Sequence, residues 1–390
     1  MSGAEPAPPT VFGAVDALRC PEDGSRLRLV SLVDFRAQLG AERPLAHRRS
    51  GPVRLPDWLL VRADGKAGYP IIEGIPLLLV PEMIGVADEQ NRVDIADARY
   101  AEAYEEMAYY NQTSATMAEA MESTTAYRDA AKAAEQPQTS FPEPLVDWLD
   151  ERFDSLSQRD AYRHIAPIAG QRVLQLGGKG LHAVKFLLAG AREAWCSTPM
   201  HAEAAFAHAL ADRLGVGDRL SSVVSIAEEL PFPDDFFDVV YSGHSVHHMI
   251  TELAFPEIHR VLAPGGRFAA TDPFQAPLYD IGTRVFGKRE SVYCRPLTAA
   301  RLAPLATTFD ESRIEGHGAI VRYPLLALQK VLRVEPSMGA AIRIAEIEDR
   351  LARRVHAPAR WCSSVAVTAT KSADGARGRP PGGSEAPTPR

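Results

Sequence analysis

Three histidines stand close together in the segment GHSVHHM, residues 243–249. His244 and His248 are four residues apart, which places both side chains on one face if this turn is helical. Imidazole groups accept and donate protons near neutral pH. We therefore predict that His244, His247 and His248 are catalytic residues that orient or deprotonate a bound molecule.

Two other uses of these histidines stay open. His247 or His248 could pack within the turn and have only a structural role. His244 and His248 could instead bind a metal ion together with Cys196 and Asp272, because nitrogen, thiolate and carboxylate groups are metal ligands. Of these two uses we reject metal binding, and we predict that the chain holds no metal.

A glycine-rich turn precedes this segment, in QRVLQLGGKGLHAVKFLLAG, residues 171–190. The pattern predicts an apolar strand, a turn and an amphipathic helix. Gly177 and Gly178 would let the backbone come close to a ligand at the start of the helix. The charge of Lys179 either meets an anionic group of that ligand or faces solvent.

Strands and helices alternate around this turn. We expect a second strand within residues 191–200, a further strand that ends near Ser242, and another after the Pro-Gly-Gly turn within residues 257–274. Such alternation predicts an α/β fold with a Rossmann-like, doubly wound sheet. Ligands of these sheets bind at the carboxyl ends of the strands, where the glycine turn and the histidines would meet.

The motifs of this stretch resemble those of the class I S-adenosylmethionine-dependent methyltransferases, in particular the quinone-biosynthesis type, methyltransferase type 11. The resemblance covers about residues 141–275. It rests on Leu230-Pro231-Phe232, Asp235, Phe237-Asp238, Val240, His247-His248 and Arg260-Val261-Leu262-Ala263-Pro264-Gly265-Gly266.

This resemblance implies S-adenosyl-L-methionine as cofactor and methyl transfer to a small molecule or biosynthetic intermediate. The cofactor-binding residues that it implies, together with Lys179, are Gln175, Gly177, Gly178, Ser197, Ala227, Glu228 and Ser242.

Several positions depart from the family pattern. Gln175 and Ser197 stand where the first two strands of the family usually end in acidic residues, Lys179 replaces a glycine, and Ile226 replaces another acidic residue. A charge-assisted hydrogen bond contributes about 1.5–3 kcal/mol, so each loss should weaken cofactor binding. We expect Glu228, Gln175 and Ser197 to compensate in part.

These departures keep two alternatives open. The methyltransferase fold could carry a different reaction, assisted by histidine or metal. It could also serve as a non-catalytic partner of a biosynthetic enzyme, because a fold by itself does not fix a function.

Residues for the methyl acceptor are predicted from three parts of the chain. Tyr109 and Tyr110 belong to a helical segment that would cap the cofactor, as in similar methyltransferases. Asp272 follows a predicted strand, and Arg322 and Tyr323 are placed to line the same cavity.

The amino-terminal part resembles the small zinc-ribbon family that activates several methyltransferases. Cys20-Pro21 and Tyr69-Pro70-Ile71, followed by Gly74-Ile75-Pro76-Leu77, carry the resemblance. Zinc needs four ligands in a closed site, yet this segment has only Cys20, with Asp23 at the partner position. We therefore predict a degenerate ribbon without zinc, with a structural role or a role as a lid on the substrate side.

The chain of 390 residues has a formal net charge of −7 and divides by composition into five parts. We expect no nucleic-acid partner, since no segment before the extreme end is strongly basic. No apolar run reaches the ~18–20 residues of a membrane-spanning helix, and no secretory signal is recognisable, so we expect a cytoplasmic protein. Its oligomeric state stays open.

The predicted parts are a disordered start over 1–14, a ribbon-like β domain over 15–85, a helical cap over 86–140, the α/β domain over 141–371 and a disordered tail over 372–390.

Overall fold

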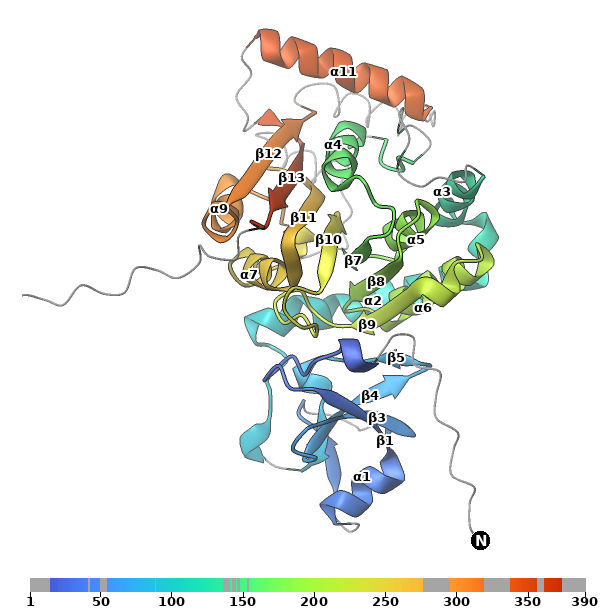
Figure 1. Ribbon diagram of the computed structural model, residues 1–390, viewed down its shortest axis with the longest axis vertical. Helices are drawn as coiled ribbons and strands as arrows, with labels where there is room; N and C mark the ends of the chain where they lie inside the picture. Colours follow the sequence, from blue (N-terminus) through green and yellow to red (C-terminus); the bar gives the residue numbers. More distant parts are fainter. Residues whose placement is uncertain are drawn as a thin grey trace, which may run out of the picture.

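The computed structural model describes residues 15–40, 43–49, 55–87, 89–135, 141, 145, 148–152, 154–275, 295–318, 337–355 and 361–373. The predicted disordered ends, 1–14 and most of 372–390, lie outside this part. Figure 1 shows a β-rich amino-terminal module, a larger α/β domain, and a long helix α2 (Ala98–Glu119) that crosses between them.

The α/β domain contains a seven-stranded sheet with the order β12-β13-β11-β10-β7-β8-β9. Its strands are β7 (Arg172–Leu176), β8 (Glu193–Thr198), β9 (Leu220–Val224), β10 (Phe237–Gly243), β11 (Leu262–Pro273), β12 (Glu311–His317) and β13 (Ser364–Thr370). The five strands from β11 to β9 are parallel, and β13 runs antiparallel to both of its neighbours. The strand order reverses direction between β7 and β10, which is where such sheets bind ligands. The predicted Rossmann-like fold is confirmed.

Successive residues of β7 point to opposite faces of the sheet, and both faces are buried. Val173 packs in one hydrophobic cluster and Leu174 in another, as expected for a parallel sheet covered on both sides. One face carries α3 (Thr125–Ala134), α4 (Ser155–Ile165), α5 (Leu181–Leu188) and α6 (His201–Arg213). The other carries α7 (Thr251–Val261), α9 (Ala299–Thr308) and the amino-terminal module.

The amino-terminal module occupies a place that a helix would otherwise fill. The connection from β9 to β10, residues 225–236, contains no helix, so apolar side chains on that face of the sheet need another cover. Leu60 and Tyr69 of the module lie in one cluster with Trp195 and Val223 of the sheet. The module is therefore part of the core of the protein.

The module is built on an antiparallel sheet with the order β1-β3-β4-β6-β2, to which β5 adds beside β4. Its elements are β1 (Leu27–Ser31), α1 (Leu32–Leu39), β2 (Leu45–His47), β3 (Trp58–Arg62), β4 (Ala67–Ile72), β5 (Ile75–Pro76) and β6 (Ile84–Val86). β4 and β5 pair as an antiparallel hairpin. Cys20 is buried, with its sulfur 3.3 Å from the hydroxyl of Tyr69.

Within residues 86–140 the structure has the helices α2 and α3. Asp97 begins α2, since its side chain accepts a hydrogen bond from the backbone N–H of Arg99, and Thr124 does the same for α3. The predicted Pro-Gly-Gly turn lies inside β11, where the pairing register with β10 shifts between Leu262 and Arg267.

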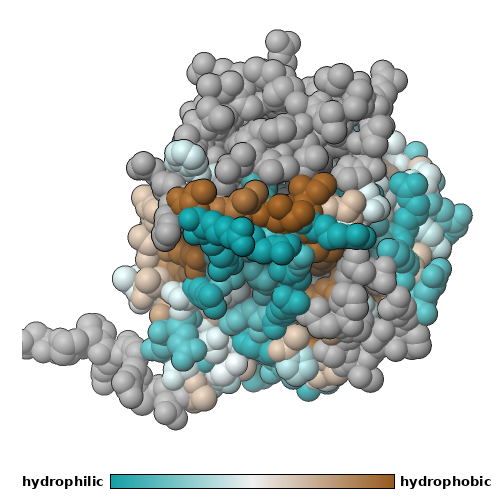
Figure 2. All heavy atoms as spheres, turned by 90° about the horizontal axis from the view of Figure 1, so that it is seen from above, coloured by the Kyte–Doolittle hydropathy of each residue, from teal (hydrophilic) through white to brown (hydrophobic). Residues whose placement is uncertain are grey.

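The end of the α/β domain farthest from the module carries α11 (Met338–Arg354) (Figure 1). In the view onto this end, apolar atoms form a strip beside polar ones (Figure 2). The exposed apolar residues of α11 are Ile347 and Leu351. Within the part of the chain that the structure describes, every helix is too short or too polar to span a lipid bilayer.

The first prediction concerns the contact between the glycine turn and α6. Gly180 has φ +73°, and a Cβ atom there would lie 2.3 Å from Cβ of Ala207. Gly180→Ala should therefore destabilise the fold by about 2–4 kcal/mol, through backbone strain and overpacking. Denaturant unfolding measures this change.

A matched control separates the two causes. Gly24 has a similar φ of +69° but open space around it, so Gly24→Ala should cost only about 1 kcal/mol. Adding Ala207→Gly to Gly180→Ala should restore much of the lost stability. An unchanged loss in the double variant would show that the contact with Ala207 is not the cause.

A second prediction concerns the pH dependence of stability. His317 lies between two carboxylates, with Nε2 3.0 Å from Asp160 and Nδ1 3.0 Å from Asp349 of α11. Burial alone would lower the pKa of His317, but these hydrogen bonds and charges, with Glu315 nearby, raise it to about 9.

The raised pKa stabilises the folded state below the ordinary pKa of about 6.5, and this contribution disappears as the pH rises through about 9. We expect the wild type to lose about 2–3 kcal/mol more than His317→Gln between pH 6.5 and 9. Parallel curves of unfolding free energy against pH for the two proteins would contradict this.

Candidate active site

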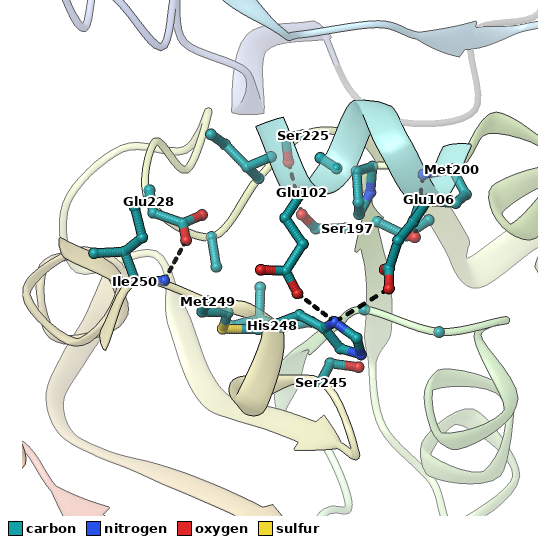
Figure 3. Close-up of a pocket in the computed structure, with 18 of the residues that line it drawn as sticks. Glu102, Glu106, Ser197, Met200, Ser225, Glu228, Ser245, His248, Met249 and Ile250 are labelled. Carbon is teal, nitrogen blue, oxygen red and sulfur yellow. Dashed lines mark hydrogen bonds and ion pairs between the residues drawn. The ribbon is translucent and has the colours of Figure 1, made fainter. Parts of the chain in front are cut away.

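A pocket of about 490 Å³ lies at the carboxyl ends of the central strands, beneath α2. It brings together the glycine turn after β7, the end of β8, the loop after β9 and the histidine-containing turn after β10 (Figure 3). The predicted residues that line it are Tyr110, Gly177, Gly178, Lys179, Ser197, Ala227, Glu228, His244 and His248.

The glycine turn forms one wall of the pocket. Gly177 has φ +72°, and a Cβ atom on it would lie 2.3 Å from the hydroxyl of Ser245, so only glycine fits. A Cβ on Gly178 would meet nothing closer than 3.6 Å, which leaves room for a ligand to approach.

Gln175 lies behind this turn and does not line the pocket. Its amide nitrogen donates to the carbonyl of Gly177 over 2.8 Å, and its amide oxygen accepts from the N–H of Ala183 over 2.7 Å. Both ends of the side chain therefore fix the shape of the turn, and its compensating role in cofactor binding would be indirect.

Hydroxyl groups and one unpredicted carboxylate stand at the end of β8. The hydroxyls of Ser197 and Ser225 are 2.7 Å apart, and Thr198 donates to Glu203 over 2.7 Å. Burial raises the pKa of Glu203. Lys179 reaches toward the same carboxylate at 3.9 Å, so its charge is turned to the pocket side of the glycine turn.

His248 is held by two glutamates from α2. Its Nδ1 lies 2.7 Å from Glu102 and 3.5 Å from Glu106, and Arg295 also donates to Glu102. Figure 3 shows both carboxylates reaching the same nitrogen of His248, with the other ring nitrogen turned away from them. Burial would lower the pKa of His248, but the hydrogen bond that its ring donates to Glu102 and the two negative charges raise it.

His244 lies on the other side of the turn and has its own carboxylates. Its Nε2 is 3.0 Å from Asp154 and its Nδ1 is 3.6 Å from Glu151. Burial opposes the charged form, yet these two groups raise the pKa of His244 to about 10. His244 is therefore an imidazolium near neutral pH and can stabilise negative charge in the pocket.

His247 and Asp272 lie behind His248 and do not line the pocket. The ring and the backbone N–H of His247 both donate to one oxygen of Asp272, over 2.7 and 3.1 Å. The rings of His247 and His248 are in contact, with centroids 4.0 Å apart. These contacts indicate that His247 positions the ring of His248.

The alternative metal site is not assembled by the fold. Among the described residues, His244 and His248 contact separate carboxylates, Asp272 binds His247, and the buried sulfur of Cys196 faces the carbonyl of Gly178. Glu102, Glu106 and His248 offer three ligand atoms within 4.8 Å of one another. Their hydrogen bond and ion pair already account for that arrangement.

Glu228 lines the pocket, as the sequence indicated. One of its oxygens accepts a hydrogen bond from the N–H of Ile250 over 2.6 Å (Figure 3). Burial raises the pKa of Glu228 to about 7, so this side chain is only partly ionised near neutral pH.

The remaining predicted residues lie in different places. Ser242 is fully buried below the pocket, and Tyr109 is 48% exposed, beside Tyr110. Arg322 and Tyr323 lie outside the described residues.

Sequence reasoning missed the pocket glutamates of α2 and α6. Glu102 and Glu106 are four residues apart on a helix, so their side chains share one face, and this spacing could have indicated a pair. Glu203 offered no such pattern, because it lies in the first turn of α6.

The family model for a methyltransferase domain matches residues 174–270. A demethylmenaquinone methyltransferase of Clavibacter sepedonicus is 32% identical over 131 residues, which are 32% of this chain and 49% of that protein. A mitochondrial 2-methoxy-6-polyprenyl-1,4-benzoquinol methylase of Xenopus laevis is 41% identical over 76 residues, 18% of this chain and 24% of that protein.

The chain thus spans about a quarter to a half of the length of these relatives. Among solved structures, the [4+2]-cyclase SpnF overlaps with a TM-score of 0.42 at 19% identity, over 70% of this chain and 97% of that one. A geranyl diphosphate methyltransferase in complex with S-adenosylmethionine gives 0.38 at 16% identity, over 62% and 94%. By sequence, residues 174–270 match the model of a methyltransferase domain, and the structure places them in a Rossmann-like sheet.

Proposed function

We propose that this protein is an S-adenosylmethionine-dependent methyltransferase that acts on a small molecule or biosynthetic intermediate. The observation that carries the proposal is the pocket at the sheet's switch point, whose wall is the glycine turn of the methyltransferase domain. The relatives named for benzoquinol and demethylmenaquinone methylation support the same reaction class.

The residues of the pocket fit the cofactor in part. Gly178 leaves the backbone open to a ligand, and Ala227 and Glu228 line the pocket with it. When bound, S-adenosylmethionine supplies a methyl group on a positively charged sulfur. Side chains of both charges line the pocket, with Glu102, Glu106, Glu203, Glu228 and Glu252 beside Arg99, Lys179, Arg295 and Arg301.

His248 is the residue that we propose as the base. Both glutamates bind its Nδ1, so Nε2 is the nitrogen that can take a proton from an acceptor. Glu102 and Glu106 would stabilise the imidazolium that forms, and the packed ring of His247 holds the side chain in place. Placing the acceptor in line with the methyl group supplies much of the remaining rate.

We further propose that the degenerate, ribbon-like module serves to hold α2 over the pocket. Tyr104 of α2 donates to Glu82 of the module over 2.8 Å, and the N–H of Leu78 donates to the carbonyl of Val224 in β9 over 2.8 Å. The module therefore binds both α2 and the sheet of the α/β domain.

Calorimetric titration with S-adenosylmethionine and S-adenosylhomocysteine tests the proposal. We expect micromolar binding at one site per chain, followed by acceptor screening for methyl transfer. Gly178→Val should abolish binding, because its side chain fills the open space of the turn. Gly24→Val is the matched control, since φ is similar there but the site lies outside the pocket.

The absence of binding at millimolar ligand would contradict the proposal. The methyltransferase fold would then serve a non-methylating reaction or a non-catalytic partnership.

A further inference from the structure

The end of β8 lacks a carboxylate of its own. In α/β folds that bind nucleotides, an acidic side chain about 20 residues after the glycine turn accepts hydrogen bonds from the ribose. Here the strand ends in Ser197 and Thr198, and the hydroxyl of Ser197 is already 2.7 Å from that of Ser225. The strand itself therefore offers no strong acceptor for a pair of ribose hydroxyls.

Glu203 brings a carboxylate back to this point from α6. Its side chain is 7% exposed and lines the pocket. One oxygen, Oε2, accepts a hydrogen bond from Thr198 over 2.7 Å, which orients the carboxylate over the end of β8. The other oxygen, Oε1, has Lys179 at 3.9 Å, beyond hydrogen-bond distance.

The packing of α6 explains why Glu203 faces the glycine turn. Ala207, one helical turn further along α6, lies against Gly180, where a Cβ atom would come within 2.3 Å of it. Residues four apart share one face of a helix. The contact between Ala207 and Gly180 therefore sets the rotation of α6 and directs Glu203 to the pocket side of the turn.

We propose that Glu203 is the ribose-binding residue of this protein, accepting hydrogen bonds from the cis-diol of an adenosyl ligand in place of the missing carboxylate on β8. This inference rests on the proposed function. A buried carboxylate is costly to keep charged unless it is well paired. Lys179 lies 3.9 Å from Glu203, and burial raises the pKa of Glu203. Two hydroxyl groups of a ligand would donate further hydrogen bonds to this carboxylate, beside the one from Thr198.

The test compares ligands with and without the diol. The wild type should bind S-adenosylhomocysteine about 10- to 100-fold more tightly than its analogue lacking the ribose 2′- and 3′-hydroxyls. Glu203→Gln should weaken binding of S-adenosylhomocysteine about 10- to 100-fold and leave the analogue within about threefold of its wild-type affinity.

The matched control is Asp212→Asn, which removes an exposed carboxylate from the other end of the same helix and should change neither affinity. Thermal unfolding of Glu203→Gln checks that the variant is folded. If the variant does not fold, the comparison of the two ligands on the wild type still tests the inference.

Equal binding of the two ligands to the wild type, or unchanged binding of S-adenosylhomocysteine by Glu203→Gln, overturns this inference and leaves the proposed function in place. A wild type that binds neither ligand overturns the proposed function and this inference with it.

Discussion

Replacing Lys185 with methionine is expected to destabilise the protein by about 3–5 kcal/mol. Lys185 is fully buried on α5, and its Nζ donates to the carbonyl of Trp148 over 2.8 Å and to Asp150 over 3.1 Å. Burial alone would raise the pKa of Asp150, but the charge of Lys185 lowers it overall. Without the lysine, Asp150 is a buried charge without its cation, and denaturant unfolding should register the loss.

Two comparison variants make this prediction specific. Lys66→Met removes an exposed lysine and should stay within about 0.5 kcal/mol of the wild type. Adding Asp150→Leu to Lys185→Met should recover part of the stability, because no unpaired charge is left. Equal losses in the single and double variants would show that the ion pair is not what Lys185 contributes.

The ion pair between Lys185 and Asp150 also affects the pocket. Asp150 directly precedes Glu151, and Glu151 and Asp154 are the two carboxylates that hold His244. Gln158 of α4 accepts hydrogen bonds from the N–H groups of Asp150 and Glu151, both over 3.1 Å. Lys185 therefore also holds one wall of the candidate site.

The second large effect is expected for His248→Ala, which should lower kcat of methyl transfer by about 10²–10⁴-fold. The reason is the loss of the base whose Nδ1 is oriented by Glu102 over 2.7 Å. Steady-state rates with the acceptor identified by screening measure the change. Binding of S-adenosylhomocysteine should remain, which separates loss of the base from loss of the cofactor site.

The pH profile distinguishes a base from a structural histidine. His248 accepts a proton only when it is neutral, so the rate should rise with pH through its raised pKa. Glu106→Gln removes a negative charge 3.5 Å from Nδ1, lowers the pKa of His248 and should move the rise to lower pH. Glu105→Gln, an exposed neighbour on α2, should leave the profile in place. A profile that Glu106→Gln does not move would exclude His248 as the base.

Local sequence patterns predicted the strands β7, β8, β10 and β11 of the α/β domain but not β9 or β12. The apolar run before Gly177 and the run that ends near Ser242 became β7 and β10. β12 was not predicted, because Glu311–His317 is a largely polar strand whose first four residues are all exposed. Its position is set by pairing with β13, which no local pattern encodes.

The candidate site was predicted in part for a related reason. Residues next to the ends of β7, β8 and β10 could be placed, since parallel strands bring their carboxyl ends to one edge. The same reasoning could not predict which of the adjacent residues His247 and His248 faces the pocket. His248 faces the pocket, whereas His247 turns to Asp272, and this difference depends on the backbone of one short turn.

The sequence by itself determined the strand–turn–helix units, the glycine turn with its neighbouring strand ends, and the methyltransferase resemblance, because short-range periodicity and backbone preferences encode them. Only the tertiary structure decided which charges meet in the pocket. Glu102 and Glu106 reach His248 across about 140 residues of chain, and Glu203 turns to the pocket because Ala207 packs on Gly180. Such contacts follow from how helices and sheet pack in three dimensions, and packing is fixed by the whole chain.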